Sequence, residues 1–205
     1  MLELVHTTDA SWALALNAHP VELLCDHAHC ELGAAASAQA LIHRHARDTG
    51  LVERMGALAA EELAHFRQVH GVIAERGGRL EPGLPNPYVE GLLKAAKRSS
   101  GPWLSAMGER DAGLLDRLLV SGLIEARSHE RFGLLAEHLE DSELRSLYAE
   151  LGPSEHGHAH LFPKLAVERF DSDLVERRAA ELVGLEGALV AELPFAPRMH
   201  SGAPA

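Results

Sequence analysis

Apolar residues recur every three or four positions over most of this 205-residue chain, and no stretch alternates strictly between polar and apolar residues. The first pattern is typical of amphipathic α-helices and the second of half-buried strands, so the pattern predicts an all-α protein. Aromatic residues make up only 4% of the chain, and leucine and alanine fill most of the apolar positions. This composition also favours helix over strand.

The spacing predicts four long helices and two shorter ones. The long helices span about residues 20–47, 51–76, 111–139 and 142–170, and the shorter ones about 88–98 and 173–193. Short links follow the first and the third long helix, so each pair is expected to form an antiparallel hairpin. Two hairpins joined by a long, proline-rich connection predict a single domain over residues 1–205. Its fold is a four-helix bundle with a crossover connection and additional helices, the topology of ferritin-like folds.

Prolines interrupt two of the predicted elements. Pro153 and Pro163 lie inside the fourth long helix, and each is expected to kink or break it, because proline lacks the N–H that an interior helical residue donates. Ser99 to Pro102 is expected to end the short helix at about 88–98.

The charge balance limits the kind of partner. The chain has 19 basic and 30 acidic residues, a formal net charge of −11, so on average it repels the nucleic-acid backbone. A local basic patch stays open, and the candidate is Lys94, Lys97 and Arg98 on the short fifth helix. A solvated helix face explains these residues equally well.

Cysteine content and hydropathy suggest a location. The two cysteines, Cys25 and Cys30, argue against a disulfide scaffold and fit a reducing compartment. No apolar run is long enough for a membrane span, and the first residues do not have the pattern of a signal peptide. We therefore expect a cytoplasmic protein with no membrane partner.

Glutamate and histidine stand three residues apart at Glu62–His65 and at Glu155–His158. On a helix this spacing places both side chains on one face, where together they can hold a metal ion. Either pair alone is weak evidence, because the chain is rich in Glu and has 14 His. The pairs become informative through the residues that precede them.

Each pair follows another glutamate at nearly the same distance. Glu31 lies 31 residues before Glu62, and Glu125 lies 30 residues before Glu155, so both hairpins present one Glu and then Glu-x-x-His at similar heights. This is the ligand set of carboxylate-bridged di-iron bundles, and four carboxylates balance the charge of two Fe(II) ions. The predicted metal ligands are Glu31, Glu62, His65, Glu125, Glu155 and His158. Any one of these glutamates, taken alone, is equally well a solvated helix residue.

Other histidines have less specific positions. His27 and His129 each lie four residues from the first Glu of a hairpin, where they either orient that carboxylate or are ordinary, partly exposed helix residues. His156 and His160 flank His158, and either is a competitor for its place as a ligand.

In several segments the chain resembles the bacterial tRNA 2-methylthio-N6-isopentenyladenosine hydroxylases. These segments span most of the chain in order: DHAHCE at 26–31, EELAHF at 61–66, LIEARS at 123–128, ERF at 130–132, SE at 154–155 with His158, and RMHSG at 198–202. The resemblance implies a ferritin-like, non-haem di-iron monooxygenase with the same six ligands. The chain departs from the family at His129, where Cys is common, and at Ala159 and His160, where a large apolar residue usually follows the last motif.

The resemblance also implies a reaction and partners. The expected activity is O2-dependent hydroxylation of the isopentenyl group of (2-methylthio-)N6-isopentenyladenosine next to the tRNA anticodon. It requires two iron ions, O2 as co-substrate, the tRNA anticodon stem-loop, and an external electron donor such as a reductase or a ferredoxin-type protein. Two alternatives stay open, a ferritin-like iron-oxidising or iron-storage protein and a metal-free helical interaction module.

Overall fold

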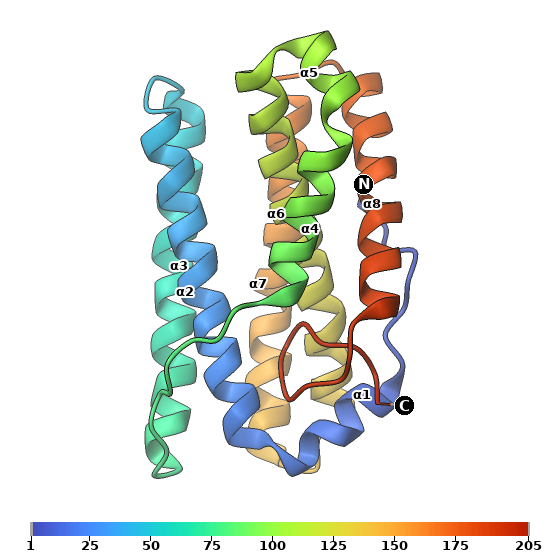
Figure 1. Ribbon diagram of the computed structural model, residues 1–205. Helices are drawn as coiled ribbons and strands as arrows, with labels where there is room; N and C mark the ends of the chain where they lie inside the picture. Colours follow the sequence, from blue (N-terminus) through green and yellow to red (C-terminus); the bar gives the residue numbers. More distant parts are fainter. Residues whose placement is uncertain (1, 205) are drawn as a thin grey trace. The chain divides into compact units, whose positions relative to one another are not determined.

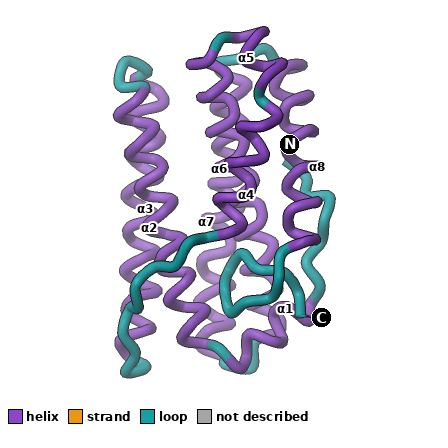
Figure 2. Tube along the Cα trace, viewed as in Figure 1, coloured by secondary structure: helices purple, strands orange, loops and turns teal. Residues whose placement is uncertain are grey.

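The computed structural model describes residues 2–204, and within them every regular element is a helix (Figures 1 and 2). The all-α prediction is confirmed. The elements are α1 (Ala10–Ala15), the 3-10 turn η1 (Leu16–Ala18), α2 (Pro20–Arg44), α3 (Thr49–Glu75), α4 (Pro87–Ser99), α5 (Gly101–Met107), α6 (Glu109–His138), α7 (Ser142–Val167) and α8 (Ser172–Glu192).

The chain divides into two compact units. One comprises residues 18–84 and 197–199, and the other comprises residues 2–17, 85–196 and 200–204. The assignment of the whole chain to a single domain stays a prediction. Among residues 2–204, no helix combines the length and the apolar character needed to cross a bilayer.

The first unit is built on the hairpin of α2 and α3, which pack along each other (Figure 1). Pro20 opens α2 at a position where its missing N–H costs no helical hydrogen bond. The turn is closed by Asp48, whose side chain accepts a hydrogen bond from the Leu51 N–H at 3.0 Å and so caps α3. Leu24 of α2 and Met55 of α3 are fully buried.

The second unit is organised around α6, which forms a hairpin with α7 and also contacts α1, α4, α5 and α8. Because neighbours surround it, α6 buries residues on several faces, and these include Arg127 and Arg131. Asp141 caps α7 by accepting from the Glu143 and Leu144 N–H groups at 3.0 and 3.2 Å.

Helix α7 runs without interruption through Pro153 and Pro163, so the breaks expected there do not occur. A proline costs an interior helix one donor, and here packing against α6 compensates for that loss. The two helices approach closely near Pro163. A Cβ atom added to Gly122 of α6 would lie 3.3 Å from the Pro163 Cδ and 3.2 Å from the Phe162 Cβ.

Two short helices were not predicted. Helix α1 is capped by Asp9, whose side chain accepts from the Ser11 N–H at 2.8 Å, and it fixes the fully buried Trp12. Helix α5 begins at Gly101, so the predicted stop at Ser99 to Pro102 is one residue wide, and Pro102 lies in the first turn of the next helix.

Candidate metal centre

The α2–α3 hairpin brings three predicted ligands together. Glu31 lies on α2 and Glu62 and His65 lie on α3, with 4%, 1% and 8% of their surfaces exposed. One ligand atom from each lies within 4.8 Å of the others. The His65 Nδ1 is 3.6 Å from a Glu62 carboxylate oxygen and 3.7 Å from a Glu31 carboxylate oxygen.

His27 lies one turn before Glu31 on α2 and is completely buried. Its Nε2 is 2.6 Å from the Glu31 Oε1, so the imidazole donates a hydrogen bond to the carboxylate. Of the two interpretations left open by the sequence, the structure supports the one in which His27 orients Glu31. Such donors fix the direction in which a carboxylate offers its remaining lone pairs.

The protonation of this cluster follows from the groups around it. Burial raises the pKa of Glu31, but interactions with His27 and His65 outweigh it and hold the pKa below its ordinary value. Burial lowers the pKa of His65, but Glu31 and Glu62 raise it to about 10. The two carboxylates are thus ionised and share the positive charge of one imidazolium, which is the position that a bound cation would take.

The α6–α7 hairpin brings together the other three predicted ligands. Glu125 lies on α6 and Glu155 and His158 lie on α7, and all three are buried. A ligand atom of Glu125 and one of His158 lie within 4.8 Å of each other. The His158 Nδ1 is 4.0 Å from a Glu155 carboxylate oxygen.

The donor set of each hairpin fits a divalent metal ion. Two carboxylates balance the charge of one such ion, and a neutral imidazole completes three protein ligands. Mixed oxygen and nitrogen donors suit iron or manganese. Two carboxylates buried side by side are costly without a cation, because each disfavours the ionisation of the other.

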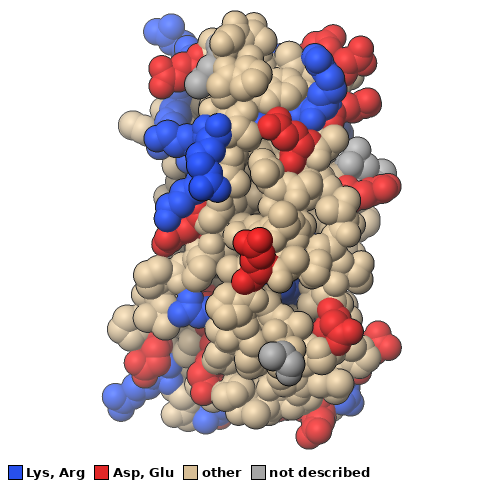
Figure 3. All heavy atoms as spheres, turned by 45° about the vertical axis from the view of Figure 1, so that its right-hand side comes forward, with Lys and Arg blue, Asp and Glu red and all other residues tan. Residues whose placement is uncertain are grey.

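The predicted basic patch lies on the exposed face of α4. Lys94, Lys97 and Arg98 are all exposed, and the Lys94 ammonium is 3.9 Å from a Glu90 carboxylate oxygen. Tyr88 is buried on the opposite face of the same helix. On the face shown in Figure 3, Lys and Arg side chains gather in a small group near one end, while Asp and Glu side chains are scattered.

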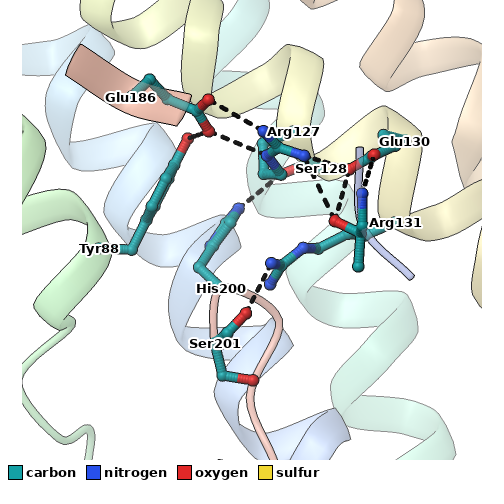
Figure 4. A network of polar contacts seen from close by, with 9 residues as sticks. Tyr88, Arg127, Ser128, Glu130, Arg131, Glu186, His200 and Ser201 are labelled. Atoms are coloured by element: carbon teal, nitrogen blue, oxygen red, sulfur yellow. Dashed lines mark hydrogen bonds and ion pairs between the residues drawn. The ribbon is translucent and has the colours of Figure 1, made fainter. Parts of the chain in front are cut away.

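A buried ionic network next to Glu125 in the sequence was not predicted (Figure 4). Arg127 of α6 donates two hydrogen bonds of 2.9 Å to the Glu186 carboxylate of α8 and a further one to Glu130. Tyr88 of α4 donates to the same Glu186 at 2.9 Å. Burial and the adjacent Glu186 raise the pKa of Tyr88 well above its usual range, so its proton stays in place.

The C-terminal tail joins this network (Figure 4). The His200 ring stacks on Tyr88, with ring centroids 4.7 Å apart and planes at 11°, and its Nε2 lies 3.3 Å from the Ser128 hydroxyl. Arg131 donates to the Ser201 carbonyl at 2.6 Å. Burial and the neighbouring Arg127 lower the pKa of Arg131 to about 10.

The resemblance had pointed to this tail, but nothing in the sequence assigned it a contact. The available signal was the four-residue spacing of Arg127 and Arg131 on a helix that is otherwise apolar on several faces. Charged residues at helical spacing are also typical of a solvated face, so the pattern alone does not separate the two cases.

The fold and the buried donors define a class of protein. A bundle of two helix hairpins that each carry one Glu and a Glu-x-x-His pair is ferritin-like, and it belongs to the di-iron carboxylate class. The chain belongs to the tRNA-(MS[2]IO[6]A)-hydroxylase (MiaE) family, whose model matches residues 2–201. The family resemblance and the ferritin-like fold predicted from the sequence are both confirmed.

Two relatives carry the name tRNA 2-(methylsulfanyl)-N(6)-isopentenyladenosine(37) hydroxylase. The one from Pseudomonas putida is 36% identical over 201 residues, which cover 96% of this chain and 91% of the relative. The one from Salmonella typhimurium is 34% identical over 159 residues, which cover 76% of this chain, and the chain spans about half (53%) of that relative's length.

A solved structure is also similar to this chain. It is described as protein 43 with aldehyde deformylating oxygenase activity from Synechococcus, and it is 41% identical. The TM-score is 0.86, and the match covers 98% of this chain and 96% of the other.

Proposed function

We propose that this protein hydroxylates the isopentenyl side chain of N6-isopentenyladenosine, with or without the 2-methylthio group, next to the anticodon of tRNA. The observation that carries the proposal is the match of nearly the whole chain to a family of tRNA hydroxylases, together with a buried Glu, Glu and His in each hairpin. An iron-storage role is not favoured, since the similar proteins are named for oxygenase or hydroxylase activity.

The proposed cofactor is a pair of iron ions. Three side chains of each hairpin would serve as ligands: Glu31, Glu62 and His65 from α2–α3, and Glu125, Glu155 and His158 from α6–α7. The chemistry that bound iron supplies is the activation of O2 for insertion of one oxygen atom into a C–H bond. The second oxygen atom leaves as water, so each turnover consumes two electrons and two protons.

The residues of the chain have three roles in this proposal. The six ligands hold the metal, and His27 keeps the Glu31 carboxylate in one orientation through its 2.6 Å hydrogen bond. The near-complete burial of the ligands excludes water from the reaction. Lys94, Lys97 and Arg98 on α4 would contact tRNA phosphates, which position the substrate without reading its sequence.

The two electrons come from a separate protein in this proposal. The chain has two cysteines, too few for an iron–sulfur cluster of four thiolates, and no glycine-rich nucleotide-binding motif was found in the sequence. A reductase or a ferredoxin-type donor would therefore dock on the enzyme. A cytoplasmic location follows from the tRNA substrate and is part of the same proposal.

A second candidate is an aldehyde deformylating oxygenase. The observation that favours it is the 41% identity to a solved protein with that activity. The buried Glu and His residues fit either chemistry, because both need iron and O2. The two candidates differ in substrate, since one acts on a nucleoside in tRNA and the other on an aldehyde.

The test compares the two substrates directly. The iron-loaded protein, with an added ferredoxin and reductase, is incubated with tRNA that carries the isopentenyl group and, separately, with a long-chain aldehyde. Mass spectrometry of the nucleosides should show a gain of one oxygen atom, and gas chromatography should show no shortened hydrocarbon. Glu125→Ala should remove the product, whereas the exposed Glu53→Ala should not. Hydrocarbon without hydroxylated nucleoside would overturn the proposal in favour of the second candidate.

A further inference from the structure

We propose that His129, His156 and His160 form a second metal site, which binds a zinc-class divalent ion on the surface of the α6–α7 hairpin. The ring of His156 is 4.9 Å from the ring of His129 and 4.4 Å from the ring of His160, measured between centroids. Two imidazoles that share one tetrahedral ion, with Zn–N distances of about 2.0 Å, have centroids about 5 Å apart. The three rings are therefore at the spacing that a shared ion requires.

The hydrogen bonds of two of these rings prepare them as ligands. The His129 Nδ1 is 3.0 Å from the Gly152 carbonyl oxygen, and the His160 Nδ1 is 2.8 Å from the His156 carbonyl oxygen. A carbonyl oxygen only accepts, so in both rings Nδ1 carries the proton and Nε2 carries the lone pair. A second-ring-nitrogen contact of this kind is usual for metal-bound histidine, because it fixes the tautomer and the orientation of the ring.

The position of the residues on the helices supports the same conclusion. His156 and His160 are four residues apart on α7, the spacing that places two imidazoles on one face of a helix for one ion. His129 supplies the third imidazole from α6. His156 and His160 are exposed and His129 is half-buried, so an ion can reach the site from solvent.

The site differs in chemistry from the buried one. Its donors are three imidazoles with no carboxylate, a set that suits zinc, nickel or copper, while the two Glu and one His of each hairpin suit iron or manganese. Three protein ligands leave a fourth position open to water. An ion held there would link α6 to α7, and it would stabilise the folded hairpin in proportion to its binding, because the unfolded chain does not hold the three rings together.

The binding test uses the full chain loaded with iron and then dialysed against micromolar zinc at neutral pH. Metal analysis should find one more zinc per chain in the wild type than in the double variant His156→Ala/His160→Ala. The iron content should be equal in the two proteins. The matched control is His43→Ala, an exposed histidine on α2, which should bind as much zinc as the wild type. Equal zinc in the wild type and in the double variant would overturn the proposal.

A second measurement separates binding at this site from loss of folding. Zinc should raise the melting temperature of the wild type and of His43→Ala, and it should leave that of the double variant unchanged. The single variant His129→Ala should weaken zinc binding about tenfold or more, as expected when one contributor to a metal site is lost. Unchanged zinc affinity in His129→Ala would exclude the bridge between α6 and α7. The iron content reports on the buried site separately, so failure of this proposal does not depend on the proposed function.

Discussion

At the residue scale, Arg127 is a charged side chain that the interior accommodates. It has no exposed surface, and Glu186 receives two of its N–H groups in a bidentate contact while Glu130 receives a third. Glu186 is itself fully buried and also accepts from Tyr88. Buried ions of opposite sign tolerate desolvation when they are paired in this way, and removal of one partner leaves the other without compensation.

Glu186→Ala should therefore destabilise the protein strongly. The variant leaves the Arg127 guanidinium and the Tyr88 hydroxyl buried without their shared acceptor, at a cost of about 3–5 kcal/mol in the free energy of unfolding. Urea unfolding followed by circular dichroism measures this value. Glu192→Ala, an exposed position on the same helix, is the control and should change stability by less than about 0.5 kcal/mol. A loss below about 1 kcal/mol for Glu186→Ala would mean that the ionic contact is not retained in solution.

A second prediction at this scale concerns the hydrogen bond from His27 to Glu31. His27→Ala removes the donor that orients this carboxylate, so iron affinity should fall about 10–100-fold. Competition with a chromophoric chelator measures the affinity without turnover. His43→Ala on the same helix lacks any such contact in the hydrogen-bond network described above and should leave the affinity unchanged. Equal affinities for the two variants would show that Glu31 does not need the imidazole.

At the scale of elements, the contact of α6 with α7 depends on the absence of a side chain. A Cβ atom on Gly122 would lie 2.7 Å from a Leu2 methyl carbon and within 3.3 Å of atoms of Phe162 and Pro163. Leu2 can move, since a methyl group at the end of a side chain is flexible, but the atoms on α7 are close to its backbone. The proline in α7 is thus matched by a glycine in α6, a pairing that helical periodicity does not reveal.

Gly122→Ala should destabilise the hairpin by about 1–3 kcal/mol, because the added methyl group overpacks the contact. Gly133→Ala lies on the same helix with nothing within 4 Å of its added Cβ, and it should stabilise the protein by up to about 1 kcal/mol through helix propensity. Thermal unfolding of the two variants gives the comparison. The opposite signs separate crowding from propensity, and two stabilising substitutions would contradict the close approach.

At the scale of the whole molecule, the C-terminal tail contributes to both compact units. Residues 197–199 belong to the unit of α2 and α3, where the Met199 N–H donates to the Asp26 carboxylate at 2.8 Å. Residues 200–204 belong to the other unit, where His200 stacks on Tyr88. A tail of irregular backbone is held in place because its polar groups find buried partners.

Gly202→Ala should release this tail. The added Cβ would lie 1.7 Å from the Leu193 carbonyl oxygen, a distance that backbone atoms cannot accommodate without moving the segment. Hydrogen exchange should become faster over residues 197–204, and trypsin should cleave more rapidly after Arg198. Gly184→Ala on α8 has open space around its added Cβ and is the control. Unchanged exchange in the Gly202 variant would show that the tail does not pack in this manner.

Much of the secondary structure and the candidate ligands follow from spacing alone. Helix α3 was expected at about 51–76 and spans Thr49–Glu75, because its apolar residues recur with the helical period. Glu62 and His65 share a face for the same reason, and their burial agrees with the expectation that they are not solvated. Helix α1 was missed because six residues are too few for a periodic pattern, and its stability comes from burying Trp12.

The sequence by itself determined the helical class, the two hairpins and the spacing of the six proposed ligands, since these depend on interactions between residues near one another in the chain. Only the tertiary structure decided that α7 continues through two prolines, that His27 donates to Glu31, and that Arg127 pairs with Glu186. The last contact joins residues 59 positions apart, and helical periodicity carries no information about such partners. The physical reason is that burial turns an ordinary polar side chain into one that requires a specific partner, and packing decides which residues are buried.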